Sequence, residues 1–183
     1  MKLSIITASY NSSLTIKDCI ESVEKQTFQN IEHIIIDGNS KDDTIEIVRT
    51  TPNLVKKIIS EPDSGIYDAM NKGIKLSNGD IIGILNSDDL YANKNVIQII
   101  MKEFESDPKL EAIHTDLEYV DKKNTEKIIR HWTTGNFTKN SFLKGWHPAH
   151  PTLFLKKSVY EKCGLFDLDF KFAADFEFML RIF

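Results

Sequence analysis

Two adjacent carboxylates, Asp88 and Asp89, lie just beyond the apolar run IIGIL, with Asn86 and Ser87 directly before them. Two ionised carboxylates at the end of an apolar strand repel each other unless something neutralises them. The pair could lie in a solvated turn or at a helix N-cap, where the repulsion is small. It could instead supply oxygen ligands to a divalent cation. This stretch by itself does not choose between these arrangements.

Polar side chains follow three other apolar runs in the same way. The run LSIITASY ends at Tyr10, IEHIIID ends at Asp37, and VKKIIS leads into EPDSG. Ligands of open parallel sheets bind beyond the carboxyl ends of the strands, so these groups are expected to share one edge. Each of them also fits an ordinary turn or cap. In DGNSKDDT, Ser40 and Asp43 are predicted to form a capping box for a helix over 41–50.

The segment DSGIYDAMNKG carries three polar side chains on one predicted helical face: Asp68, Asn71 and Lys72. This face lies opposite the apolar stripe of a helix expected over 64–77. A surface ion pair between Asp68 and Lys72 explains the pattern, because residues four apart are neighbours on a helix. The start of this helix faces the same sheet edge, so Lys72 could instead meet a phosphate as a point charge.

Asp175 shares a predicted helical face with the apolar residues Phe178, Met179 and Ile182 near the end of the chain. An Asp at a helix start is favoured by the helix dipole alone. A carboxylate on an apolar face is also partly desolvated, which makes it a better general base. The spacing leaves both roles open.

Histidines and tryptophans gather between residues 132 and 150. His147 and His150 are predicted to line a pocket from a loop, because no third ligand of matching type lies near to complete a metal site. Trp132 and Trp146 fit either a platform for stacking sugars or core packing.

The elements that position these residues alternate between strand and helix in the first 120 residues. Such an alternation predicts an α/β fold with a mostly parallel, twisted sheet and helices on both faces. Beyond it, PTLFLKKSVYEKCG is expected to form a strand and a helix closed by Gly164, and a last helix begins near Ala173. The predicted strands cover 3–10, 31–37, 55–60, 81–85 and 111–120, and the first helices cover 13–25, 41–50, 64–77 and 94–106, with Leu14 and Ile66 among the core positions.

Composition narrows the class of protein. The chain has 183 residues, 41% of them hydrophobic, and a net charge of −4, which argues against a nucleic-acid partner. No apolar run approaches the roughly 20 residues of a spanning helix, and the N-terminus lacks a signal peptide. Cys19 and Cys163 match no metal spacing and are read as free thiols of a reducing, cytoplasmic compartment. The chain ends inside a predicted helix, so a longer natural chain is expected.

An ordered series of segments resembles the family 2 glycosyltransferases of the GT-A fold. The series comprises SIITASYN, IEHIIIDGNSKDDT, EPDSGIYDAMNKGI, GDIIGILNSDDLY and HPTLFLKKSVYEKCGLFDLDFKFAADFEFMLR, and spans almost the whole chain. The DSGIYDAMNKG form is similar to the bacterial branch that builds capsule, exopolysaccharide or lipopolysaccharide. The resemblance implies one GT-A domain over 1–183, with a nucleotide-sugar-binding half (1–120) and an acceptor-binding half (121–183).

The resemblance also implies roles for individual residues. Asp175 would be the catalytic base, and Asp88 and Asp89 would bind Mg²⁺ or Mn²⁺ on the donor diphosphate. Two positions depart from the family pattern: Asn86 replaces the first Asp of the Asp-x-Asp motif, and Ala174 replaces a Glu that often precedes the base. The residues that would contact the nucleotide sugar are Thr7, Ala8, Tyr10, Asp37, Asp68, Asn71, Lys72, Asn86 and Ser87.

The activity implied is transfer of a sugar, with inversion, from a nucleotide-diphospho-sugar to a glycan or lipid-linked acceptor. A UDP-sugar is the favoured donor, and a lipid-linked acceptor would bring the enzyme to the inner face of the membrane as a peripheral protein. A module that binds a nucleotide sugar without catalysis is the alternative, and donor hydrolysis separates the two. A receiver-like domain is disfavoured because it needs an acidic pair after the first strand, where this chain has Thr7, Ala8 and Ser9. A nucleotidyltransferase is disfavoured because the Gly-rich basic loop that it needs at the same place is missing.

Overall fold

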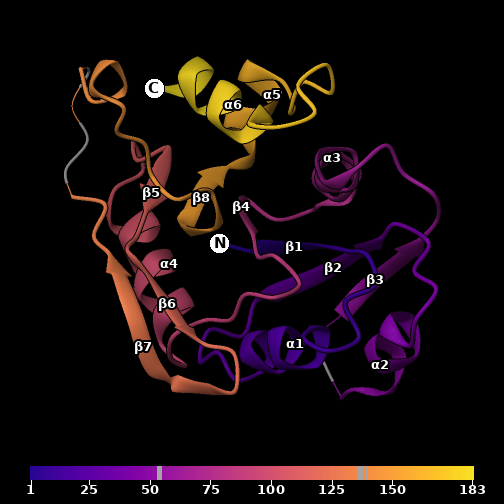
Figure 1. Cartoon of the computed structure of the whole chain (residues 1–183). Helices are drawn as coiled ribbons and strands as arrows, with labels where there is room; N and C mark the ends of the chain where they lie inside the picture. Colours follow the sequence, from indigo (N-terminus) through magenta and orange to yellow (C-terminus); the bar gives the residue numbers. More distant parts are fainter. Residues whose placement is uncertain (53–54, 136–137, 139) are drawn as a thin grey trace.

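A central six-stranded sheet organises the chain, in the order β3-β2-β1-β4-β8-β5 (Figure 1). This computed structural model describes residues 1–52, 55–135, 138 and 140–183. The first four strands pair in parallel, and β8 runs antiparallel between β4 and β5. The strands of this sheet are β1 (Leu3–Ser9), β2 (Ile31–Asp37), β3 (Val55–Ser60), β4 (Ile81–Ile84), β5 (Ala112–His114) and β8 (Leu153–Lys156).

The apolar runs form strands because both faces of the sheet are covered. Every residue of β1, β2 and β4 is buried, as expected for strands in the middle of a parallel sheet. Side chains alternate between the faces: Ile34 and Ile36 enter one hydrophobic cluster, and Ile35 enters a cluster on the other face. The four strands predicted in the first half are confirmed to within one residue.

Helices cover the sheet on both sides, which confirms the predicted α/β architecture. The side chains of α3, α5 and α6 pack together on one face, and those of α1, α2 and α4 pack on the other; Figure 1 shows α3 and α1 on opposite sides of the strands. The first four helices each begin two or three residues later than predicted. The helices are α1 (Ile16–Glu24), α2 (Thr44–Thr50), α3 (Ile66–Leu76), α4 (Val96–Ser106), α5 (Lys157–Cys163) and α6 (Ala174–Ile182), with 3-10 turns η1 (Phe142–Lys144) and η2 (His150–Thr152).

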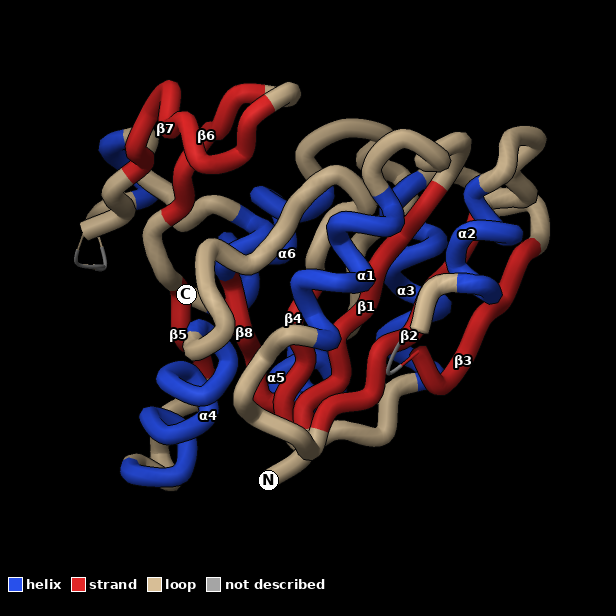
Figure 2. Tube along the Cα trace, turned by 90° about the horizontal axis from the view of Figure 1, so that it is seen from below, coloured by secondary structure: helices blue, strands red, loops and turns tan. Residues whose placement is uncertain are grey.

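The single strand predicted over 111–120 is wrong. Its first part is β5 of the main sheet, and its second part is β6 (Leu117–Asp121), which pairs with β7 (Asn124–Trp132) in a separate hairpin (Figure 2). The chain leaves the sheet at Thr115 and Asp116, whose backbone carbonyl and carboxylate accept hydrogen bonds from the Thr134 hydroxyl (2.9 Å) and backbone N–H (2.7 Å). These bonds direct the hairpin away from β5.

Three local expectations also fail. The Ser40–Asp43 capping box is absent, because the Ser40 hydroxyl and backbone N–H both donate to Asp37. Asp42 instead accepts a hydrogen bond from the Thr44 backbone N–H at the start of α2, at 3.1 Å. Leu14 and Ile66 lie at helix starts outside the core, with 84% and 48% of their surface exposed.

The last part of the chain largely matches expectation. The predicted strand and helix are β8 and α5, and Gly164 ends α5 with a φ of 83°. The last helix, α6, begins at Ala174. Cys19 and Cys163 are free and lie in α1 and α5 as predicted. In the described part of the chain, no helix combines the length and the apolar character needed to cross a bilayer.

Candidate active site

Polar groups from four strands lie at one edge of the sheet. Ser9 of β1 is opposite Asp37 of β2, and Asp37 is opposite Ser60 of β3. Because β4 also pairs in parallel with β1, Asn86 lies beyond the same edge. The shared edge expected from the sequence is therefore present.

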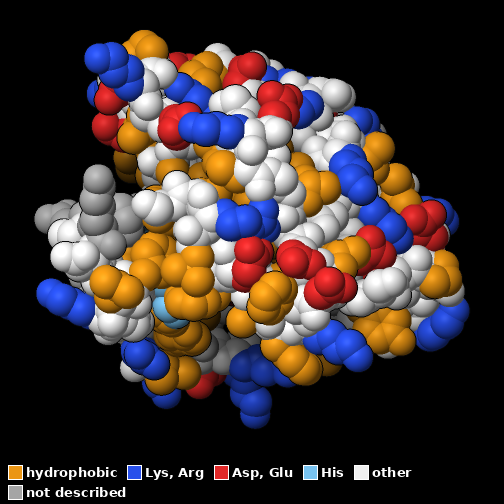
Figure 3. Space-filling model, turned by 90° about the horizontal axis from the view of Figure 1, so that it is seen from above, with side chains coloured by type: hydrophobic (Ala, Val, Ile, Leu, Met, Phe, Trp, Pro, Cys, Tyr) orange, Lys and Arg blue, Asp and Glu red, His pale blue; other side chains and the backbone are white. Residues whose placement is uncertain are grey.

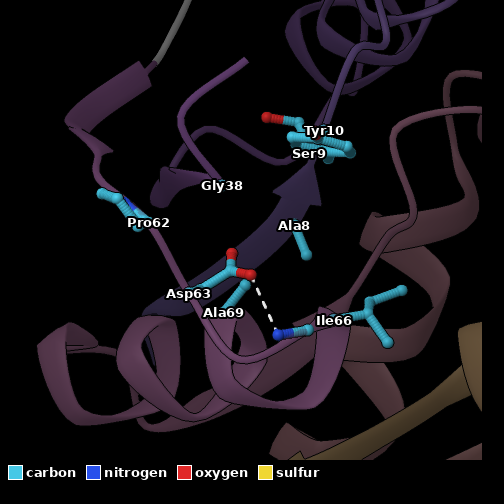
Figure 4. A pocket seen from close by; sticks show the side chains of 9 residues that line it. Ala8, Ser9, Tyr10, Gly38, Pro62, Asp63, Ile66 and Ala69 are labelled. Atoms are coloured by element: carbon cyan, nitrogen blue, oxygen red, sulfur yellow. Dashed lines mark hydrogen bonds between the residues drawn. The ribbon is translucent and has the colours of Figure 1, made fainter.

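A pocket of about 530 Å³ opens at this edge (Figure 4). Ala8 and Tyr10, two of the residues expected to hold the nucleotide, lie in its wall. The pocket combines apolar and aromatic surface with one carboxylate, which suits a flat heterocycle that has an N–H donor. Its walls are the end of β1, the turn after β2, the loop after β3 and the first turn of α3: Ala8, Ser9, Tyr10, Gly38, Pro62, Asp63, Gly65, Ile66 and Ala69.

Thr7 lies outside this pocket. Its side chain is buried on the α1 side of the sheet, where Oγ1 lies 2.9 Å from Nε2 of His33 and 3.9 Å from Sγ of Cys19. Because successive side chains of a strand point to opposite faces, Thr7 faces the core when Ala8 faces the pocket.

The pocket's carboxylate belongs to Asp63, which the sequence reasoning placed at the shared edge, within EPDSG, but did not select as a binding residue. Asp63 Oδ1 accepts a hydrogen bond from the Gly65 backbone N–H at 2.9 Å (dashed in Figure 4). Gly38 makes room for this side chain, since a Cβ at position 38 would lie 2.8 Å from Asp63 Oδ2. The only sequence signal was position: Asp63 is the first carboxylate after Pro62, in the loop beyond β3.

Asp37 is fully buried, and its carboxylate connects the ends of β1, β2 and β3 through hydrogen bonds. Its carboxylate accepts hydrogen bonds from the hydroxyls of Ser9 (3.3 Å) and Ser60 (2.7 Å), and from the Ser40 backbone N–H (2.9 Å) and hydroxyl. The carboxylate therefore braces the turn that contains Gly38. Its expected contact with a nucleotide base stays a prediction.

The polar residues of α3 divide between surface and core. Lys72 Nζ lies 2.9 Å from Glu61 and 3.4 Å from Asp68, and the bond to Glu61 raises the pKa of Lys72. The surface ion pair is thus present, and Asp68 also accepts a hydrogen bond from the Ser64 backbone N–H at 3.0 Å. The placement of Asn71 on this surface is wrong: Asn71 is buried and makes hydrogen bonds of 2.8 and 3.0 Å with the backbone of Phe166.

The Asn86–Asp89 stretch forms a turn, and α4 begins only at Val96, which excludes the helix N-cap. Asn86 Nδ2 donates to Asp89 Oδ2 at 2.8 Å, and the Ser87 hydroxyl lies 2.8 Å from that of Ser12. Burial raises the pKa of Asp89, and the negative charge of Asp88 raises it further. On the face seen from above in Figure 3, acidic side chains near the centre lie beside Lys or Arg side chains.

These two carboxylates fit a cation that is also held by a substrate. Within the described ranges, no three His, Cys, Asp or Glu side chains converge on one point. Asp88 and Asp89 nevertheless offer adjacent carboxylate oxygen ligands just beyond the end of β4. Mg²⁺ is commonly bound by one or two carboxylates together with substrate phosphates, so the pair meets that need.

Asp175 lies in the first turn of α6 and reaches α3. The Tyr67 hydroxyl donates a hydrogen bond to Asp175 Oδ1 at 2.8 Å. Burial lowers the pKa of His150, and the negative charge of Asp175 offsets only part of this shift. A neutral imidazole therefore lies near this carboxylate. Phe178 and Met179 of the same helix are buried, as the apolar face predicted.

The histidines and tryptophans of the 132–150 segment pack with aromatic residues beside α6. The His147 ring lies 6.0 Å from Trp132 and 5.4 Å from Phe176, and the His150 ring lies 5.5 Å from Phe166. Their expected roles in lining a pocket or stacking a sugar stay predictions.

Comparison with known proteins gives a family and a fold. The family model described as Glycosyl transferase family 2 matches residues 4–163. A PGL/p-HBAD biosynthesis glycosyltransferase of Mycobacterium tuberculosis is 29% identical over 184 residues, which cover 98% of this chain and 69% of the relative. An uncharacterised glycosyltransferase of the same species is 32% identical over 181 residues, covering 98% and 68%.

Solved structures share the fold at 21% identity. Residues 1–349 of S. aureus TarS in complex with UDP superpose with a TM-score of 0.78, covering 98% of this chain and 54% of that one. A mannosyltransferase from Pyrobaculum calidifontis, in complex with GDP-Man and Mn²⁺, gives a TM-score of 0.71 over 92% and 48%. The chain thus spans about half of each of these structures.

Proposed function

The chain belongs to glycosyl transferase family 2, and from that premise we propose that it transfers a sugar, with inversion, from a nucleotide-diphospho-sugar to an acceptor hydroxyl. One observation carries the proposal: the pocket at the ends of β1–β3 shares a sheet edge with the carboxylates after β4. In this arrangement residues 1–120 hold the donor and residues 121–183 bind the acceptor.

The nucleotide base occupies the pocket that Tyr10, Ala8 and Asp63 line. A carboxylate accepts a hydrogen bond from a ring N–H, which uracil has and cytosine and adenine lack, so Asp63 is compatible with a UDP-sugar. The complexes of TarS with UDP and with UDP-GlcNAc support this donor class. The roles of Thr7, Asp37, Asp68, Asn71 and Lys72 as direct donor contacts stay predictions, and each of these side chains also has a protein partner.

Asp88 and Asp89 would hold Mg²⁺ or Mn²⁺ against the diphosphate, with Asn86 and Ser87 shaping the turn. A bound divalent ion supplies charge stabilisation for the departing nucleoside diphosphate. The complex of the P. calidifontis mannosyltransferase with GDP-Man and Mn²⁺ supports the cation class. Asn86 also positions Asp89 through the 2.8 Å hydrogen bond, a use for the amide where the family has an acid.

Asp175 acts as the general base. The acceptor oxygen forms a bond to the anomeric carbon while the bond from that carbon to the diphosphate oxygen breaks. The hydroxyl proton moves to Asp175, and the bonding electron pair leaves with the nucleoside diphosphate. Attack from the face opposite the leaving group inverts the anomeric configuration. Burial lowers the pKa of His150, so the imidazole near this base is neutral.

The acceptor is a glycan or a lipid-linked sugar in the synthesis of a cell-surface polysaccharide, such as capsule or lipopolysaccharide. The enzyme works in the cytoplasm, and with a lipid-linked acceptor it works at the inner membrane face. The relative named for PGL/p-HBAD biosynthesis supports a role in building cell-envelope glycoconjugates.

Isothermal titration of UDP with and without Mn²⁺ tests the donor half of this proposal. We expect metal-dependent binding that Asp88→Asn and Asp89→Asn each weaken about 10-fold or more, since each loses a charged ligand. Metal-independent binding in both variants, equal to the parent, would remove these residues from the role. Asp175→Asn separates an enzyme from a binding module: it should still bind UDP but release none from a UDP-sugar.

A further inference from the structure

One helix, α3, contacts both the donor pocket and the segment that carries Asp175. Ile66 and Ala69, in its first turn, line the pocket. Tyr67 and Asn71, four residues apart and therefore on one face, contact the segment from Phe166 to Asp175.

The Tyr67 side chain is fixed at both ends. Its ring lies 5.6 Å from the ring of Phe166, and its hydroxyl donates to Asp175 Oδ1 at 2.8 Å. Phe166 is itself held by the two hydrogen bonds of Asn71 and by Phe178, whose ring lies 5.1 Å away. The Tyr67 hydroxyl is thus locked in place toward one carboxylate oxygen.

We propose that Tyr67 is a positioning residue for the Asp175 carboxylate, and this inference rests on the proposed role of Asp175 as base. The hydroxyl occupies Oδ1 and leaves Oδ2 to take the acceptor proton. Because the same helical turn lines the donor pocket, it sets the base relative to the donor before an acceptor binds. Preorganisation of this kind contributes to rate, since small misplacements of reacting groups are costly.

The charge state of the hydroxyl suits this role. Burial raises the pKa of Tyr67, and the hydrogen bond and charge of Asp175 raise it further. The hydroxyl therefore keeps its proton and acts as a donor at neutral pH.

A hydrogen bond that only stabilises the packing of α3 against α6 would show the same contacts. The test therefore has to separate a structural role of Tyr67 from a positioning role. Tyr67→Phe removes only the hydroxyl, and keeps the ring against Phe166 and the two hydrogen bonds of Asn71. Tyr119→Phe is the matched control, because Tyr119 lies on the β6–β7 hairpin and is 44% exposed. The probe is whichever of UDP-glucose, UDP-galactose, UDP-N-acetylglucosamine and GDP-mannose gives the largest thermal shift.

Nucleotide release with water as acceptor then gives kcat and KM for the parent and each variant. We expect Tyr67→Phe to lower kcat about 10- to 100-fold, with KM for the donor and Tm little changed, and Tyr119→Phe to match the parent. A crystal structure of Tyr67→Phe should show a reoriented Asp175 carboxylate. An unchanged kcat would overturn the inference, as would a loss of Tm and donor affinity that accounts for the lower rate.

Asp175→Asn makes the two failures distinguishable. If Asp175→Asn is inactive and Tyr67→Phe is fully active, the positioning role fails and the base assignment stands. If Asp175→Asn releases nucleotide at the parental rate, the base assignment fails and the positioning role falls with it.

Discussion

Gly38→Ala should weaken nucleotide binding through a single side chain. The three atoms nearest to a Cβ at position 38 all belong to the Asp63 carboxyl group, at 2.8, 3.3 and 3.4 Å. To reach an ordinary contact of roughly 3.4 Å, the carboxylate must move by roughly 0.6 Å, because close-packed atoms tolerate little overlap. That movement strains the 2.9 Å hydrogen bond that Asp63 accepts from the Gly65 backbone N–H. It also moves the Asp63 carboxylate away from the nucleotide base.

The expected loss of nucleotide affinity follows from the hydrogen bond between the nucleotide base and Asp63. A hydrogen bond to a charged group contributes about 1.5–3 kcal/mol, which corresponds to a dissociation constant about 10- to 100-fold higher. Global stability should change by less than about 1 kcal/mol, because the lost surface bond is offset by the reduced freedom of the unfolded chain. The φ of Gly38 is not positive, so alanine adds no backbone strain.

A double-mutant cycle decides whether the effect runs through Asp63. Titration calorimetry of UDP measures the dissociation constant for the parent, Gly38→Ala, Asp63→Ala and the double variant, and urea denaturation reports their stability. Asp63→Ala removes the clashing atoms, so Gly38→Ala should cost nothing further in that background. If Gly38→Ala weakens binding equally in both backgrounds, the reasoning about Asp63 is wrong.

Two further predictions concern stability. Burial lowers the pKa of His33 to about 3, whereas an unfolded histidine titrates at about 6.5. The unfolded chain therefore binds more protons between these values, and stability falls as pH drops below about 6.5, by about 1.4 kcal/mol per pH unit. Urea titrations at pH 7.5 and 5.0 should show this loss in the parent and a smaller one in His33→Gln; equal losses would exclude His33 as the source. Asn71→Ala should lower the unfolding free energy by about 2–4 kcal/mol, because it leaves the buried N–H and C=O of Phe166 unpaired, and a loss below about 1 kcal/mol would show that water replaces the amide.

The strands of the parallel sheet were predictable because burial on both faces makes them continuous apolar runs. The segment IEHIIID forms β2 without a change of boundary. The break between β5 and β6 was not predictable, because Thr115 and Asp116 interrupt the run only through hydrogen bonds from Thr134, which lies 19 and 18 residues later, respectively. Local pattern cannot reveal such a partner.

In the site too, features set by strand direction were predictable, and features set by distant contacts were not. The ends of β1 and β4 were found because strand direction alone brings them to one edge. Asn71 was misplaced because a helical pattern gives its neighbours on the helix, whereas its partner Phe166 lies 95 residues away. The binding role of Asp63 was missed because it depends on the space that Gly38 leaves, a contact between two loops.

The most direct test of inverting transfer is the configuration of the released sugar. The chain is incubated with an α-linked UDP-sugar and Mn²⁺, with water as acceptor, and proton NMR follows the first sugar released before its anomers equilibrate. We expect the β-anomer to appear first, together with UDP. Initial release of the α-anomer, or no release from any UDP-sugar that binds, would contradict a single displacement assisted by Asp175.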